Sequence, residues 1–197
     1  MNYHVIGGKK LSGSVRTNTS KNAAVVLLAA SLLNRGTTTL KRMPKIEEVK
    51  RLIEVMQSIG VKIESTDEGM KITPPKQLDL SKIDRVAAQK TRSIALFIAP
   101  LAHLIDSFDL PAPAGCDLGK RSLGAHIDAL AKLGIYISGD EKTNSYHTES
   151  DPSRLRQGSG EPTEIIMYEA ADTGTENVLM AAAKIPGITT IKFASAN

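Results

Sequence analysis

Three long apolar runs organise the chain. Charged side chains are rare within them, and they occupy residues 23–33, 91–104 and 173–183. A segment that is apolar all round predicts a helix buried on every side. Each run is followed by a segment that predicts a short strand, at residues 36–43, 107–110 and 186–193.

A helical spacing of apolar residues follows the first two of these strands. It predicts amphipathic helices over residues 45–59 and 122–133, each ended by a glycine. Their apolar faces consist of Ile46, Val49, Ile53 and Met56 in the first helix and Leu123, Ile127, Leu130 and Leu133 in the second. Residues 61–64 and 70–73 then alternate as a hairpin around a turn.

These elements form one unit that recurs along the chain: a buried helix, a strand, an amphipathic helix and a hairpin. The copies span about residues 20–74, 83–148 and 163–197, and the third stops after its strand. Such an internal repeat places the chain in the α/β class. Residues 1–19 predict one or two short strands, and the polar residues 139–162 predict a hairpin tip and a connection.

Composition narrows the classes of function. The chain has 197 residues, 41% of them hydrophobic, and a net charge of +4. No apolar stretch reaches the roughly 18 residues of a membrane span, and the N-terminus lacks the apolar core of a signal peptide. The single cysteine excludes an internal disulfide, which suits the cytoplasm. Basic residues do not interleave with aromatic ones, so the charge favours small anions over nucleic acid as partners.

The single cysteine, Cys116, is the first candidate for chemistry. Pro111, Pro113 and Gly115 precede it, which predicts a loop just before a helix. Lys120 and Arg121 follow closely, and nearby positive charge favours the reactive thiolate. The alternative from loop context alone is a buried cysteine that acts as a small apolar residue.

The starts of the buried helices provide the second candidate site. Lys21 and Asn22 stand at the start of the first helix, where Ser20 or Asn22 can act as the cap. Arg92 opens the second helix in the same way. A cation at a helix N-terminus can hold a phosphate, although a solvated lysine is the commoner case. The repeat predicts that Lys21, Arg92 and Arg121 converge at one end of the fold, whereas His103 is expected to be structural.

Two motifs resemble those of the UDP-N-acetylglucosamine 1-carboxyvinyltransferases, which belong to the enolpyruvyl transferase superfamily. They are Lys21-Asn22-Ala23-Ala24 and Gly115-Cys116-Asp117-Leu118-Gly119-Lys120-Arg121, the latter with His126 and Leu133-Gly134 downstream. The resemblance implies transfer of the enolpyruvyl group of phosphoenolpyruvate to the 3-hydroxyl of UDP-N-acetylglucosamine. That reaction is the first committed step of peptidoglycan precursor synthesis.

The family resemblance also implies an architecture. Each of two similar lobes is an inside-out α/β barrel, in which three repeated units surround buried parallel helices. Residues 20–197 would form most of the first lobe, with its third unit incomplete. Residues 1–19 would pair with the second lobe, whose sequence lies beyond residue 197. Because that lobe carries further functional residues, residues 1–197 alone are expected to be inactive.

The residue roles implied by the resemblance are specific. Cys116 is the expected general acid; Lys21, Arg92 and Arg121 are expected to bind the phosphoenolpyruvate phosphate; and Asn22, Arg121, His126 and Thr173 are expected to contact the UDP-sugar. No metal or other cofactor is implied. The chain departs from the usual family pattern at Thr19-Ser20, at Ser122 and at Ala171-Asp172, where family members often have Gly-Ala, Pro and Ser-Val.

Two alternatives stay open at this point. The sister enzyme 3-phosphoshikimate 1-carboxyvinyltransferase typically has Lys-Ser where this chain has Lys21-Asn22, and it lacks the cysteine. A non-catalytic anion- or nucleotide-binding module of the same fold is the other alternative. RNA terminal phosphate cyclases have similar repeats, but their histidine-centred signature is absent from this sequence.

Overall fold

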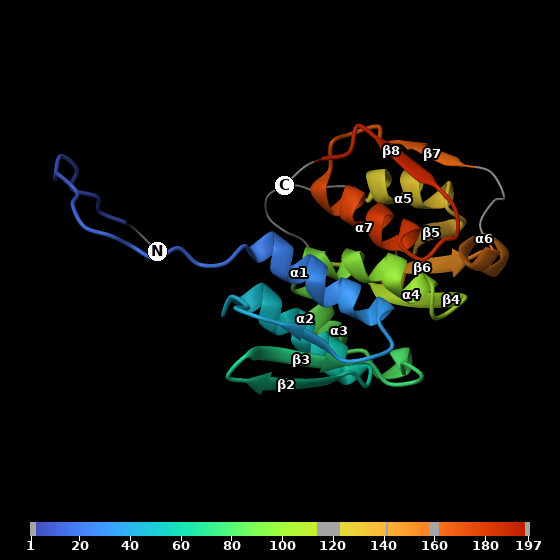
Figure 1. Cartoon of the computed structure of the whole chain (residues 1–197), viewed down its shortest axis with the longest axis horizontal. Helices are drawn as coiled ribbons and strands as arrows, with labels where there is room; N and C mark the ends of the chain where they lie inside the picture. The colour runs from blue at the N-terminus through green and yellow to red at the C-terminus, as the bar shows by residue number, and fades with distance from the viewer. Residues whose placement is uncertain (1–2, 114–122, 141, 158–161, 196–197) are drawn as a thin grey trace.

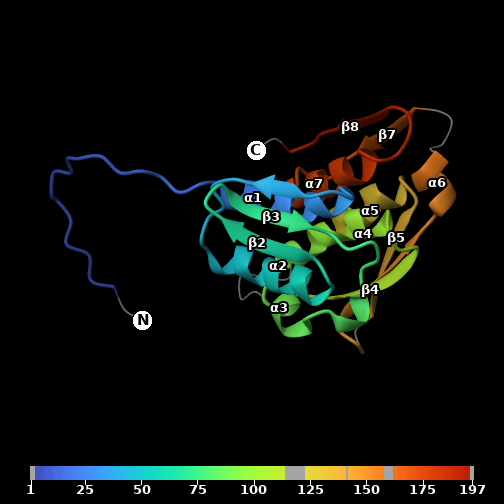
Figure 2. The ribbon, with the colours of Figure 1, turned by 60° about the horizontal axis from the view of Figure 1, so that its bottom comes forward.

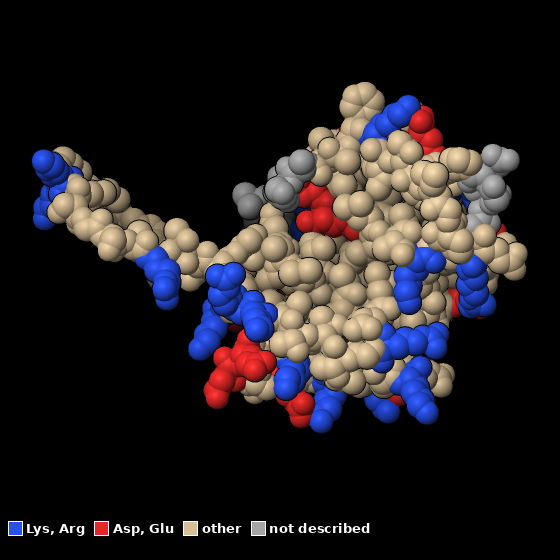
Figure 3. All heavy atoms as spheres, viewed as in Figure 1, with Lys and Arg blue, Asp and Glu red and all other residues tan. Residues whose placement is uncertain are grey.

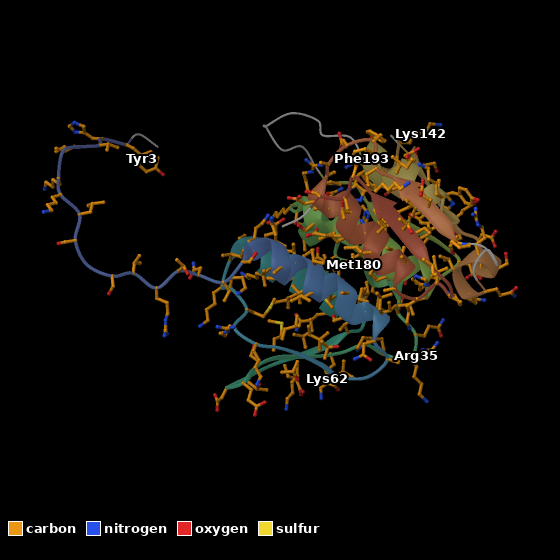
Figure 4. All side chains as sticks on the ribbon, turned by 45° about the horizontal axis from the view of Figure 1, so that its top comes forward. Tyr3, Arg35, Lys62, Lys142, Met180 and Phe193 are labelled. Atoms are coloured by element: carbon orange, nitrogen blue, oxygen red, sulfur yellow. The ribbon has the colours of Figure 1, made fainter. Side chains whose placement is uncertain are left out.

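The computed structural model describes residues 3–113, 123–140, 142–157 and 162–195. Residues 3–20 extend away from the body of the molecule without forming a strand, and the segment then bends back so that Tyr3 lies on its returning arm (Figures 1 and 4). The strands predicted for residues 1–19 are therefore wrong for the described part of that segment. A strand needs a neighbour for its backbone groups, and no described residue forms a ladder with this segment.

The first repeated unit follows the predicted order. Helix α1 (Lys21–Ala30) continues as a 3-10 turn, η1 (Ser31–Leu33), and is followed by β1 (Thr38–Leu40), α2 (Glu47–Ser58), β2 (Lys62–Thr66) and β3 (Gly69–Thr73). The strands form an antiparallel sheet in the order β1-β3-β2. Two short helices, η2 (Leu80–Lys82) and α3 (Arg85–Gln89), connect this unit to the next one.

The second unit repeats this arrangement. It contains η3 (Arg92–Phe97), α4 (Ile98–Ala102), β4 (Ser107–Pro111), α5 (Gly124–Ala131), β5 (Ile135–Asp140) and β6 (Ser145–Ser150). Its sheet has the order β4-β6-β5, which corresponds strand for strand to the first sheet. Helix α6 (Pro152–Gln157) lies in the segment that was expected to be a connection. Its pattern was missed because Leu155 is its single buried residue.

The third unit begins one strand earlier than the others. Strand β7 (Thr163–Ile166) leads into α7 (Asp172–Ala182), which returns to β8 (Thr189–Lys192). The two strands are parallel, as a helix that crosses over between them requires. Helix α7 starts one residue before the predicted run, at Asp172, so Thr173 lies in its first turn.

The core is built around η3 and α4, the first two helical segments of the second unit, which together we call the central helix. The side chains of Leu96, Phe97 and Ile98 are fully buried between α1 on one side and α7 on the other (Figures 1 and 2). The expectation that all three long helices are buried on every side is wrong for α1 and α7. Leu27 and Leu179 are 49% and 55% exposed, because no described residue covers the outer faces of these two flanking helices.

The central helix is interrupted where one continuous helix was predicted. The Asn177 side chain from α7 enters it, accepting a hydrogen bond from the Ala99 N–H (3.3 Å) and donating one to the Ala95 carbonyl (2.8 Å). In an unbroken α-helix these two backbone groups would bond to each other. The inserted amide therefore separates η3 from α4. Pro100 fits this break, because it falls in the first turn of α4.

Candidate functional site

The starts of three helices surround one cavity of about 1080 Å³, which we call the helix-end cavity. It is lined by Lys21 and Asn22 of α1, Arg92 of η3, Asp172 and Thr173 of α7, and neighbouring residues of α2 and α5. Figure 3 shows a hollow on this face of the molecule beside the N-terminal end of α7. The N-termini of helices attract anions, so this end of the fold is the best candidate for an anion site.

Ser20 caps α1 and thereby fixes where Lys21 lies. The Ser20 hydroxyl oxygen accepts a hydrogen bond from the Ala23 N–H at 3.2 Å. Lys21 follows immediately, and its Nζ forms an ion pair with Glu48 of α2 at 3.0 Å. Half of the Lys21 side chain stays exposed in the cavity, so it can also reach a ligand.

Glu48 connects the first unit to the second. Its Oε1 accepts hydrogen bonds from Thr91 (3.1 Å) and Ser93 (2.5 Å), which flank Arg92. Burial alone would raise the pKa of Glu48. The hydrogen bond from Ser93 and the interactions with Lys21 and Thr91 outweigh it, so the pKa lies below its usual value. Glu48 is therefore an anion that pairs with Lys21 and holds the two residues on either side of Arg92.

Lys21 and Arg92 line the same cavity although 71 positions separate them, and this convergence was predicted from the repeat. Cys116 and Arg121 lie outside the described residues. Pro113 and Leu123, which flank the segment containing them, both line the helix-end cavity.

His126 lies at the wall of the cavity and is only 4% exposed. Its Nδ1 is 2.9 Å from Asn177 Nδ2, and its Nε2 is 3.2 Å from Thr173 Oγ1. Burial lowers its pKa to about 4, and the charge of Arg92 acts in the same direction. Both ring nitrogens thus face protein groups, so the structure places His126 behind Thr173, which is exposed at the cavity.

Carboxylates also gather at the cavity (Figure 3, red). Asp172 accepts a hydrogen bond from the Ser195 hydroxyl, which fixes it at the start of α7. Burial raises the pKa of Glu176, the negative charge of Asp172 adds to that effect, and Lys21 opposes it. The cavity thus contains these carboxylates together with the cations Lys21 and Arg92, so it carries charges of both signs.

Sequence reasoning missed Glu48 and Asn177. Glu48 occupies an ordinary polar position of an amphipathic helix, and Asn177 is a single amide in an apolar run, so neither carried a signal of its own. His103 has the expected structural role, because its Nε2 lies 2.8 Å from the Ala181 carbonyl oxygen and joins α4 to α7.

The described residues contain no cluster of three or more His, Cys, Asp or Glu side chains suited to a metal ion. Within the same residues, no helix combines the length and the apolar character needed to cross a bilayer.

A model of the EPSP synthase (3-phosphoshikimate 1-carboxyvinyltransferase) family matches residues 5–196. The chain belongs to this family. Curated proteins are similar to the chain over nearly its whole length. One is UDP-N-acetylglucosamine 1-carboxyvinyltransferase 1 of Legionella pneumophila (strain Lens). It is 35% identical over 193 residues, which are 98% of this chain and 37% of the relative. The UDP-N-acetylglucosamine 1-carboxyvinyltransferase of Thermobifida fusca (strain YX) is 31% identical over 198 residues, 98% of this chain and 44% of the relative. The chain thus spans about two fifths of the length of these relatives.

Solved structures show the same fold. The enolpyruvyl transferase NikO from Streptomyces tendae matches with a TM-score of 0.67 and 18% identity, over 94% of this chain and 42% of that one. An EPSP synthase from Acinetobacter baumannii matches with a TM-score of 0.66 and 15% identity, over 91% of this chain and 40% of that one. The mixed α/β arrangement described above is therefore that of the EPSP synthase family.

Proposed function

We propose that this chain is the N-terminal part of a UDP-N-acetylglucosamine 1-carboxyvinyltransferase. The observation that carries the proposal is the helix-end cavity, where Lys21, Asn22 and Arg92 meet from two different repeats. These are positions to which the sequence resemblance assigns the phosphate of phosphoenolpyruvate and the amino sugar. The curated relatives that carry this enzyme name, such as those of Legionella and Thermobifida, support the same assignment.

The reaction sets three requirements. A proton is added to the vinyl carbon of phosphoenolpyruvate, the 3-hydroxyl of the sugar loses one, and the phosphate is held until it leaves. Lys21 and Arg92 supply positive charge for the phosphate, and Arg121 is the third cation in this role. Cys116 is the general acid for the vinyl carbon. Asn22, Thr173 and Arg121 contact the UDP-sugar, and His126 supports that contact from behind.

The rest of the catalytic machinery belongs to a second lobe in this proposal. The residues described here would form most of the first inside-out α/β barrel lobe, and residues 1–19 would pair with the other lobe. The exposed apolar side chains of Val5, Ile6 and Leu11 support that pairing, because such side chains are usually covered in a complete protein. The product is a precursor of peptidoglycan, so the enzyme would act in the cytoplasm in cell-wall synthesis, on which cell shape and division depend.

A second candidate, 3-phosphoshikimate 1-carboxyvinyltransferase, is favoured by the description of the matching family model and by the solved EPSP synthases. Cys116 and Asn22 argue against it, because the resemblance associates a cysteine and this asparagine with the UDP-sugar enzymes. The two reactions share phosphoenolpyruvate and differ in the acceptor hydroxyl.

The identity of the acceptor substrate therefore decides between the two candidate enzymes. Phosphate release would be measured in the whole protein that contains this chain, with phosphoenolpyruvate and either UDP-N-acetylglucosamine or shikimate 3-phosphate. We expect turnover with the first acceptor only, and a loss of more than about tenfold in kcat/KM for Lys21→Met, since a charged hydrogen bond contributes about 1.5–3 kcal/mol. Lys62→Met is the matched control, because Lys62 is an exposed strand residue outside the cavity. Turnover with shikimate 3-phosphate alone would reject the proposal.

A further inference from the structure

Asn177 is a fully buried side chain with a fixed orientation. Its oxygen faces the Ala99 N–H, and its nitrogen faces the Ala95 carbonyl oxygen. Turning the amide over would set an NH2 group against an N–H donor and an oxygen against a carbonyl oxygen. Because both of these partners are backbone groups, neither can change its role. The backbone of the central helix therefore determines which end of Asn177 is the donor.

The orientation of Asn177 determines the proton on His126. One Asn177 Nδ2 hydrogen goes to the Ala95 carbonyl, and the other points to His126 Nδ1 at 2.9 Å. Nδ1 must accept this hydrogen bond, so the ring is neutral and carries its proton on Nε2. The burial of the ring away from solvent agrees with the neutral form.

The proton on Nε2 in turn sets the direction of the Thr173 hydroxyl. His126 Nε2–H donates to Thr173 Oγ1 at 3.2 Å, which occupies the acceptor side of that oxygen. The single Thr173 hydroxyl hydrogen is then free to point into the helix-end cavity, which Thr173 lines. We infer that Asn177 and His126 are positioning residues that make Thr173 a fixed hydrogen-bond donor to a phosphoryl oxygen bound in the cavity.

The ligand class follows from the surroundings of Thr173. The cavity also contains Lys21 and Arg92, and Thr173 sits in the first turn of the 11-residue helix α7, where the helix dipole favours an anion. A donor fixed before the ligand arrives loses no rotational freedom on binding. The identification of the phosphoryl group with that of a UDP-sugar rests on the proposed function, whereas the direction of the hydrogen bonds does not.

The first test observes the protons directly. In the chain labelled with ¹⁵N, a long-range ¹H–¹⁵N spectrum at pH 7 reports which ring nitrogen of each histidine is protonated. We expect His126 to have a protonated Nε2 and an unprotonated Nδ1. Asn177→Asp presents an acceptor in place of the donor, so its spectrum should show a proton on Nδ1. A wild-type ring with a proton on Nδ1 at pH 7 would overturn the inference, even if Asn177→Asp does not fold.

The second test measures what the hydroxyl does, with inorganic phosphate and UDP as probes of the folded chain. Thr173→Ser keeps the hydroxyl and should bind at least one probe within about twofold of the wild type. Thr173→Val keeps the shape and removes the donor, so its affinity should fall by about tenfold or more. Equal affinities for the valine and serine variants, or no binding of either probe by the wild type, would show that Thr173 is not a donor to a phosphoryl group.

These outcomes separate the inference from the proposed function. If the histidine spectrum and the Thr173 variants behave as expected while the whole protein transfers no enolpyruvyl group, the hydrogen-bond chain stands and the assigned reaction fails. If turnover is found but His126 carries its proton on Nδ1, the reaction stands and the positioning role of Asn177 fails.

Discussion

Lowering the pH should destabilise this protein through protonation of His126, at pH values where most carboxylates are still ionised. The unfolded chain binds a proton at His126 with a pKa near 6.5, whereas in the folded state burial holds the pKa at about 4, helped by the charge of Arg92. The unfolded state therefore takes up the proton first as pH falls. The stability associated with the neutral ring is fully present above pH 6.5 and is lost between pH 6.5 and about 4.

The size of this effect follows from the shift. One pKa unit corresponds to about 1.4 kcal/mol, so the full displacement corresponds to about 3 kcal/mol. Between pH 7 and pH 5 the loss in the free energy of unfolding should be about 2 kcal/mol. That is a large share of the roughly 5–15 kcal/mol by which a domain is usually stable.

Urea unfolding followed by circular dichroism at pH 7, 6 and 5 measures this loss. His126→Asn is the informative variant, because its side-chain oxygen can still accept from Asn177 and does not titrate. The wild type should lose about 2 kcal/mol more than this variant over that range. His147→Gln is the control: hydrogen bonds to Asp109 and Glu149 raise the pKa of His147, so its removal should not reduce the acid loss.

A constant difference between the wild type and His126→Asn from pH 7 to pH 5 would refute the reasoning. It would mean that His126 is equally easy to protonate in the folded and unfolded chains, contrary to its burial. A titration of the His126 ring by NMR with a midpoint above pH 6 would lead to the same conclusion.

Three further substitutions test the framework around the cavity by urea unfolding at pH 7. Glu48→Ala should cost about 1–3 kcal/mol because it leaves two hydroxyls of the second unit without their acceptor, whereas the exposed Glu47→Ala should change stability by less than about 0.5 kcal/mol. Gly69→Ala should cost more than about 1 kcal/mol, since Gly69 has a φ of +143° and a Cβ there would overlap the Leu40 carbonyl; Gly139→Ala, in open space, is the control. Leu52→Ala should cost about 2–5 kcal/mol at a fully buried site, and a loss no greater than that of the half-exposed Leu27→Ala would contradict the assigned core.

Much of the fold followed from the sequence because its signals are local and repeated. The helical spacing of Val49 and Met56 predicted the buried side of α2, and both residues are in the core. The recurrence of the unit predicted that Lys21 and Arg92 would meet at one end, which they do. These features depend on periodicity, and a repeat shows the same pattern more than once, which strengthens each prediction.

The predictions that were wrong concern segments whose structure depends on a distant part of the chain. Residues 1–19 have the alternation of strands, but a strand exists only when another segment pairs with it. Leu27 and Leu179 belong to apolar runs, yet their exposure depends on what covers the flanking helices. Asn177 breaks a helix 78 residues earlier in the chain, at Ala99, and no property of either segment alone indicates that contact. Cys116 and Arg121 lie outside the described residues, so their roles stay predictions.

The insertion of Asn177 also has a consequence for the order of folding. Before α7 docks, the Ala99 N–H and the Ala95 carbonyl can bond to each other, so both groups have a partner within the second unit. Docking of α7 exchanges that bond for two bonds to the amide. The third unit can therefore assemble late on a helix that is already formed, and its arrival sets the final break in that helix. In pulse-labelling hydrogen exchange during refolding, the Ala99 amide should become protected before the amides of α7, and the reverse order would show that the third unit forms first.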